Sequence, residues 1–209
     1  MHNKVLKGAL IGTIVFSVLY ELVALIGRYF IVRIAHLFTD MGLVYDIFNH
    51  MQNGLYGLTQ LAFIIAGLAF LLANTKSLQA VLGGCVLSLR ALMLLSQAIL
   101  WTVFGLIGNT AARSMIYPDW MSWSQIVLFV AACCLIAWHY RSQAMLWLGI
   151  AAAVFKIMIQ VLYTCLSHEL INWTTYFTVT GILSLFVFAA GLVYLILWFV
   201  NAKKQKLTE

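Results

Sequence analysis

Three ionisable residues lie deep inside long apolar runs of this chain. They are Glu21, Arg90 and Lys156, each about 12 or 13 residues from the end of its run that we assign below to the cytoplasm. At a helical rise of 1.5 Å per residue, each would lie ~18–20 Å along its helix, just past the middle of a bilayer core about 30 Å thick. A charge facing lipid at that depth costs at least ~2.5–3.5 kcal/mol. We therefore expect all three at one level, facing inward, with Glu21 paired with Arg90 or Lys156.

Other polar residues continue the same helix faces, because residues four or seven apart lie on one side of a helix. A glutamine in a neighbouring apolar run joins them. We predict that this set forms an intramembrane polar cluster that binds a ligand. Its members are Glu21, Arg28, Gln60, Arg90, Gln97, Lys156, Gln160 and Tyr163.

The predicted cluster is unbalanced in charge. It holds the bases Arg28, Arg90 and Lys156 but only one acid, Glu21. Because an unpaired buried charge is strongly unfavourable, water or an anionic partner is expected to reach the bases from the outer side. Alternatively, desolvation could make the lysine neutral. A purely structural network, in which polar side chains hold helices together, is the competing interpretation.

The composition indicates which elements must position these residues. Of 209 residues, 64% are hydrophobic and 9% are charged, far from the roughly 25% charged residues of soluble domains. We predict an all-α, polytopic integral membrane protein, a bundle of six transmembrane helices in a single domain over residues 1–209, with a short basic tail at 201–209. The predicted spans are about 8–37, 54–73, 78–107, 123–138, 143–166 and 173–200.

Three of these runs have distinctive features. The first and third have about 30 residues, so a helix of ~45 Å would have to tilt or project from the bilayer. The interior of the fourth run, IVLFVAACCLIAW, has no strongly polar residue. We therefore predict that the fourth helix is peripheral to the bundle.

The charges between the runs predict the orientation. One side is almost purely basic, and the other is mainly acidic. The basic side carries Lys4, Lys7, Lys76, His139, Arg141, Lys203, Lys204 and Lys206, and the other carries Asp40, Asp46, His50, Arg113, Asp119, His168 and Glu169. The positive-inside rule then places both termini in the cytoplasm of a cell membrane, either plasma or bacterial inner membrane. The short connections at 74–77 and 139–142 predict two antiparallel hairpins.

Several kinds of chemistry find no support in the sequence. No basic, aromatic-interleaved patch suggests nucleic acid as a partner. No zinc-binding HExxH pattern, phosphate-binding loop or GxSxG nucleophile pattern occurs, so we expect neither a metal nor another cofactor. The four cysteines form no CxxC pair and are interpreted as core residues. The pair Gly83-Gly84 is interpreted as a site of close helix packing.

Three functions remain as hypotheses. The preferred one is binding or transport of an anionic solute or lipid headgroup through an outward-facing polar cavity, which is not an enzymatic role. The second is an intramembrane enzyme acting on a lipid or isoprenoid phosphate, with Glu21 or a histidine as acid or base. The third is a non-catalytic subunit or scaffold of a membrane complex. Expected partners are membrane lipids, an anionic small molecule or headgroup, and another membrane protein or a second copy of the chain.

Overall fold

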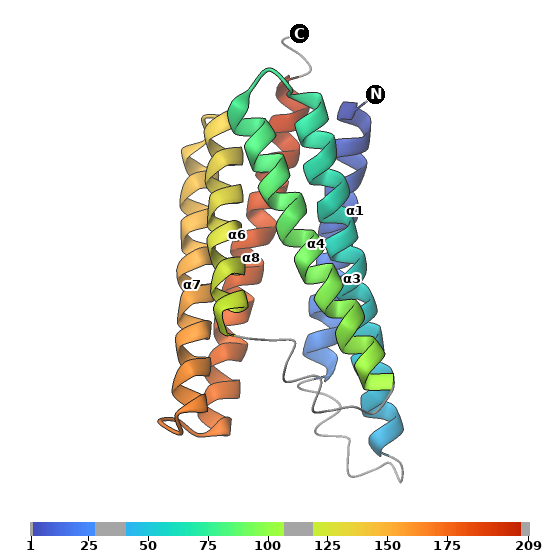
Figure 1. The fold of residues 1–209 in the computed structure, drawn as a ribbon, viewed down its shortest axis with the longest axis vertical. Coiled ribbons are helices and arrows are strands. Elements are labelled where there is room, and N and C mark those ends of the chain that lie inside the picture. Colours follow the sequence, from blue (N-terminus) through green and yellow to red (C-terminus); the bar gives the residue numbers. More distant parts are fainter. Residues whose placement is uncertain (1, 28–40, 107–118, 206–209) are drawn as a thin grey trace.

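A computed structural model describes residues 2–27, 41–106 and 119–205 of the chain (Figure 1). Within those ranges the regular structure is entirely helical, in six long helices. They are α1 (His2–Leu25), α3 (Met41–Ala73), α4 (Leu78–Leu106), α6 (Asp119–His139), α7 (Gln143–Ser167) and α8 (Trp173–Gln205). Each contains a stretch long and apolar enough to cross a membrane, as in a multi-pass membrane protein.

The helix bounds differ from the predicted spans mainly at polar ends. The α1 helix begins at His2, and positions 28–37 of the predicted first span lie outside the described residues. The α3 helix begins at Met41, well before residue 54, because the polar side chains between those positions lower the mean hydropathy without breaking a helix. For the same reason α8 runs through Gln205, into the stretch predicted as a tail.

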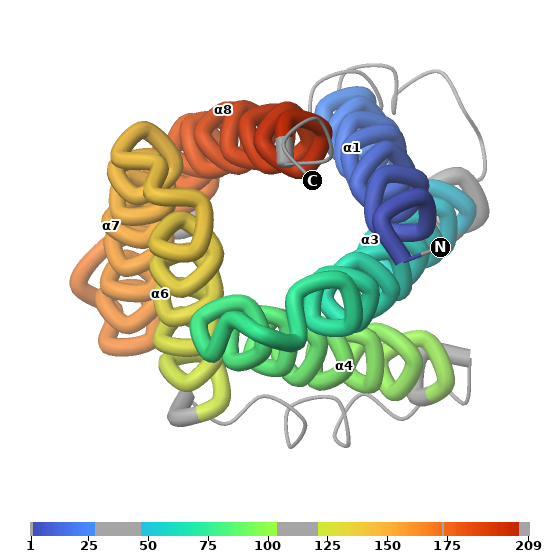
Figure 2. The backbone as a smooth tube through the Cα atoms, turned by 90° about the horizontal axis from the view of Figure 1, so that it is seen from above, coloured from blue at the N-terminus to red at the C-terminus, as the bar shows by residue number. Residues whose placement is uncertain are grey.

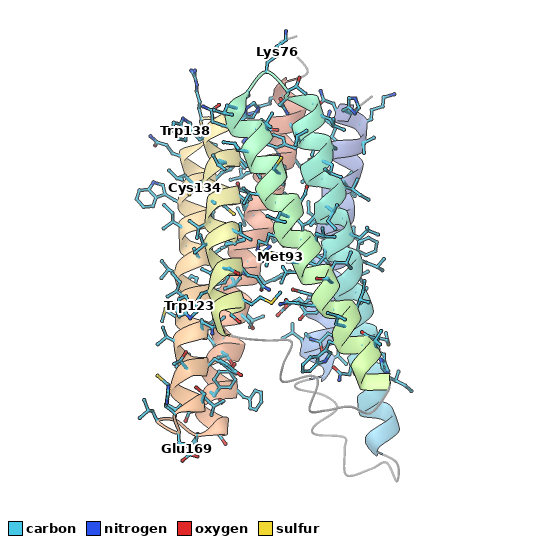
Figure 3. All side chains as sticks on the ribbon, viewed as in Figure 1. Lys76, Met93, Trp123, Cys134, Trp138 and Glu169 are labelled. Carbon is cyan, nitrogen blue, oxygen red and sulfur yellow. The ribbon has the colours of Figure 1, made fainter. Side chains whose placement is uncertain are left out.

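The six helices form a closed ring, which Figure 2 shows from above. Each helix packs against the next along the chain, and α8 returns to contact α1. Tight turns join α3 to α4 and α6 to α7, which confirms the two predicted antiparallel hairpins. The N-terminal end of α1, the C-terminal end of α8 and Lys76 lie at one end of the ring, and Glu169 lies at the other (Figures 1 and 3). We call the first of these the basic end.

Glycines let α3 and α4 approach each other backbone to backbone. A Cβ atom built on Gly84 would lie 2.5 Å from the carbonyl oxygen of Gly67 and 2.8 Å from Cβ of Leu71. A Cβ on Gly67 would likewise overlap Ser88 Oγ. Small residues at helix crossings permit such contact inside membranes. The predicted role of the glycine pair in close packing is thus confirmed at Gly84.

The best-buried core lies toward the basic end. There Phe70 makes edge-on ring contacts with Trp198 at 5.4 Å and with His139 at 5.3 Å, and a tilted contact with Tyr140 at 5.8 Å between ring centroids. Burial raises the pKa of the Tyr140 phenol, so this aromatic cluster carries no phenolate. A hydrogen bond of 2.9 Å between Ser77 Oγ and His139 Nδ1 joins the two hairpin turns across the cluster. This end of the ring is therefore closed by packed rings from α3, α6 and α8.

Candidate functional site

A cavity of about 470 Å³ lies along the axis of the ring, and side chains from all six helices line it. We call it the central cavity. The helices that supply these side chains are the six arranged around the ring in Figure 2. Ligand pockets in proteins commonly have volumes of about 300–1,000 Å³, with mostly apolar linings and a few polar groups. The central cavity is therefore large enough for a small organic ligand.

Two of the predicted cations meet in this cavity. The Arg90 guanidinium lies 5.0 Å from the ring centroid of Phe129, and the Lys156 ammonium lies 4.8 Å from the same centroid. The Arg90 Nε also donates a hydrogen bond of 3.3 Å to the backbone carbonyl of Gln125. The two charges thus lie within about 10 Å of each other, where repulsion is on the order of 1.5–2 kcal/mol at an effective dielectric constant of 20.

Glu21 also lines the cavity, but its backbone lies at a different level. The side chain of Ser88 on α4 donates a hydrogen bond to α3. Because the two helices are antiparallel, Arg90, two residues after Ser88, lies at the level of Ala62. Ala62 in turn packs against Gly12 of α1. Glu21 is nine residues beyond Gly12, or about 13 Å further along the helix, away from the basic end. The expected common level therefore holds for Arg90 and Lys156 but not for Glu21. The first run begins helical structure six residues earlier than assumed, at His2, so counting from residue 8 misplaced the acid.

The predicted ion pairs are likewise not formed. Among the described residues, no carboxylate lies within 4.0 Å of Arg90 or Lys156. Both cations instead contact α6, through the face of Phe129 and, for Arg90, through a backbone carbonyl. An aromatic face stabilises a cation by roughly 0.5–2 kcal/mol. This is weaker compensation than a buried ion pair and leaves the charges able to attract an anion.

Two predicted glutamines line the cavity on the side of the cations away from the basic end. Gln60 of α3 is 4% exposed, and Gln160 lies one helical turn beyond Lys156 on α7. In the part of the chain that the structure describes, Gln60 Oε1 and Gln160 Nε2 are buried without a hydrogen-bond partner. Such groups normally find partners, so these two offer a bound ligand one acceptor and one donor.

Two described members of the predicted cluster, Gln97 and Tyr163, do not line the cavity. Gln97 is buried in the contact between α4 and α6, where its Oε1 accepts a hydrogen bond of 2.7 Å from Gln125 Nε2. Tyr163 is 46% exposed on α7, and its ring packs near Tyr176. Arg28 lies outside the described residues. Sharing a helix face with an inward residue is thus not sufficient to face the cavity, because helices tilt and neighbours cover part of each face.

The prediction that the fourth apolar run is peripheral is wrong. That run forms α6, which supplies seven of the cavity-lining residues, Phe129 among them. The interior sequence contains no strongly polar side chain, so hydropathy could not reveal its role. Gln125, which comes just before this interior stretch, is the polar residue that could have indicated that the run lines the cavity. An aromatic ring as the partner of two cations has no sequence signature of its own.

The lining changes in character along the cavity. Beyond Arg90 and Lys156 toward the basic end it becomes apolar, and Trp198, which packs against Phe70, lies at its far limit. We call this part the apolar chamber. It is lined by Leu87, Ala132, Ile136, Leu148, Gly149, Ala152, Gly191, Leu192 and Leu195, together with Cys133, Tyr194 and Trp198, which carry a thiol, a hydroxyl and an indole N–H. The side away from the basic end carries Tyr20, Glu21, Tyr56, Gln60, Gln125 and Gln160.

The described helices and cavity define a six-helix ring around an internal cationic site. No protein-family model, curated protein sequence or solved structure matches the chain. The function proposed below therefore depends on the geometry and chemistry of the central cavity.

Proposed function

We propose that this chain is a multi-pass protein of a cell membrane and that it binds an anionic group in its central cavity, between Arg90 and Lys156. Large apolar side chains cover the outside of the ring, including Val127 and Phe177, which are 65% and 64% exposed. Trp138 also points away from the ring (Figure 3). Exposed apolar surface of this extent suits contact with lipid. Movement of the bound anion across the membrane is the further activity that we propose to test.

The observation that carries this proposal is the pair of cations at one phenyl ring. Two like charges this close repel each other, and Arg90 is buried, whereas Lys156 is half-buried. A structural network would bring an acid beside each base, whereas both bases here contact Phe129. An anion between them would be attracted by both charges and would receive hydrogen bonds from an arginine fork and an ammonium.

The charge distribution supports an outward-facing site. The start of α1, the end of α8, Lys76 and the turn between α6 and α7 that carries Arg141 share the basic end, which the positive-inside rule assigns to the cytoplasm (Figures 1 and 3). The polar part of the cavity lies on the opposite side of the cations from that end. A solute would therefore reach Arg90 and Lys156 past Tyr56, Gln60 and Gln160.

The experiment is anion binding to the protein in nanodiscs of neutral lipid. A panel of alkyl carboxylates and alkyl phosphates would be tested by their effect on thermal unfolding and by calorimetry. Loss of a charged hydrogen bond is worth about 1.5–3 kcal/mol, so Arg90→Gln and Lys156→Gln should each weaken binding at least tenfold. The exposed turn residue Lys76 supplies the matched control, Lys76→Gln.

The outcomes separate the alternatives left by the sequence. Undiminished binding in both cavity variants would overturn the proposal. Uptake of a bound anion into vesicles would identify transport, whereas conversion of an added lipid phosphate would identify an enzyme. A fixed membrane-protein partner, combined with tolerance of both substitutions, would identify a scaffold.

A further inference from the structure

We propose that the ligand of the central cavity is an anionic amphiphile with one apolar tail. Its head lies between Arg90 and Lys156, and its tail extends into the apolar chamber toward the basic end. This inference rests on the proposed function and narrows the ligand from any anion to a class with a defined shape. It follows from the lining of the chamber, from its length and from its closed end.

The apolar chamber is hostile to water and to charge. Leu148, Leu192 and Leu195 project no polar groups into it, and Leu87 separates it from Arg90 on α4. The Tyr194 hydroxyl, which also lines the cavity here, already donates a hydrogen bond of 2.8 Å to the carbonyl of Cys133. A buried water needs two to four polar partners, so water would be poorly held here. A hydrocarbon chain suits the aliphatic part of this lining. At the far end the Trp198 indole N–H, which has no hydrogen-bond partner among the described residues, is left unpaired by such a chain.

The chamber has a definite length. Leu148 and Lys156 both line the cavity from α7 and are eight residues apart, which corresponds to about 12 Å of helix. Trp198 closes the end, since it is 1% exposed and packs edge-on against Phe70. The chamber therefore accommodates a tail up to a limit, and a longer tail would have to fold back.

The two cations determine the direction in which the ligand lies in the cavity. Polar groups of Gln60 and Gln160 lie on the other side of the cations from the chamber. An anionic head at Arg90 and Lys156 can accept hydrogen bonds from both bases and from the Gln160 amide, while its tail remains among apolar side chains. A second charge at the far end of the tail would exchange its hydration for little more than the single Trp198 indole N–H, which is strongly unfavourable.

The test is a chain-length series on the whole protein in neutral nanodiscs, with empty discs as the background. Acetate, butanoate, octanoate, decanoate and tetradecanoate would be titrated, and the same tails as alkyl phosphates would distinguish the two kinds of head. We expect affinity, referred to free aqueous ligand, to rise at least 100-fold from butanoate to decanoate and then to level off. Decanol and decanedioate, which lack the head charge or add a second one, should bind at least tenfold more weakly than decanoate.

Two results would overturn the inference in different ways. If butanoate bound as tightly as decanoate, in a manner that depends on Arg90 and Lys156, the tail assignment would be wrong and the anion site would stand. If decanoate and decanedioate bound equally, the chamber would not exclude charge, and the inference would also fail. If no carboxylate or phosphate of any length bound in a manner dependent on the two cations, the proposed function itself would fail.

A variant can block the chamber without disturbing the frame. Gly191 of α8 lines the cavity, and a Cβ atom built on it meets nothing within 4 Å. Gly191→Leu should weaken decanoate binding at least tenfold and leave butanoate binding within twofold. Gly8 also has open space at its Cβ but does not line the cavity, so Gly8→Leu is the matched control and should change neither. The wild-type series decides the question if Gly191→Leu does not fold.

Discussion

The glycines at Gly84 and Gly191 show two different uses of the same residue. At Gly84 a methyl group would overlap the Gly67 carbonyl, because α3 and α4 touch through their backbones. At Gly191 the same methyl group would enter open space on the cavity side of α8. The central cavity is thus enclosed by helices that pack closely elsewhere, and it is not a sign of loose packing throughout. Substitutions at Gly84 should therefore test helix packing, and substitutions inside the cavity should test ligand binding.

The largest effect is expected at the close crossing of α3 and α4. Gly84→Val inserts a branched side chain where even a Cβ is 2.8 Å from Leu71 Cβ. Overpacking costs typically 1–3 kcal/mol, so the melting temperature should fall by about 2–12 °C for a chain of this size. Thermal denaturation in detergent, followed by size-exclusion chromatography, measures this. An unchanged melting temperature, matching that of a Gly8→Val control, would contradict the packing described here.

Removing a cavity charge should act in the opposite direction. Lys156→Met keeps an unbranched side chain, one atom shorter, but removes the charge and its repulsion from Arg90. Without added ligand we expect stabilisation by about 1–2 kcal/mol, or roughly 2–8 °C, together with loss of anion binding. A drop in melting temperature would instead show that Lys156 has a structural partner. Lys76→Met, on an exposed turn, should change stability by less than about 0.5 kcal/mol.

A smaller effect is expected where α4 meets α6. Gln97 and Gln125 are joined by a hydrogen bond of 2.7 Å, and Gln97 also donates to the Met121 sulfur at 3.0 Å. Hydrogen bonds between membrane helices contribute about 0.6 kcal/mol on average. A double-mutant cycle with Gln97→Leu and Gln125→Leu should therefore give a coupling free energy near that value. Additive effects of the two substitutions would mean that the two side chains do not interact.

The smallest effect is expected at the open glycine. Gly191→Ala adds one methyl group to space, and alanine favours a helix by up to about 1 kcal/mol over glycine. Stability should stay constant or rise slightly, and binding of short anions should not change. A destabilisation comparable to that of Gly84→Val would show that α8 packs closely at this position, and that the cavity lining is misassigned there.

The helices and their pairing could be predicted from the sequence because their causes are local. Runs of apolar residues indicate the six helices, and the turns at 74–77 and 139–142 are too short to allow any arrangement but hairpins. Helix ends were less predictable, since the polar residues after Met41 lower hydropathy but still form regular helix in α3. Gly84 was identified because small residues at crossings follow a simple steric rule.

The candidate site was predictable in part, for a physical reason. A charge in an apolar run is costly enough to reveal that Arg90 and Lys156 turn inward. The relative level of Glu21 depends on how far α1 slides along α3, which tertiary contacts such as that of Gly12 with Ala62 determine. The position of Phe129 in the cavity could not be predicted, because an aromatic side chain in an apolar run can equally well face lipid. Gln97 faces a neighbouring helix because of how the helices tilt, and residue spacing in the sequence does not reveal tilt.

The hydrogen bond between Ser77 and His139 ties the helices together at the basic end of the ring, so the two ends of the ring would move by different amounts when helices tilt. It joins the turns of the two hairpins at one extremity, where the aromatic cluster also holds α3, α6 and α8 together. A rotation about that extremity acts as a lever with an arm as long as the helices. For α7, with 25 residues and so about 37 Å of length, a tilt of only 5° would displace the remote end by roughly 3 Å. Small changes in helix tilt near the turns would thus move the helix ends on the Glu169 side of the ring far more than the surroundings of Trp198.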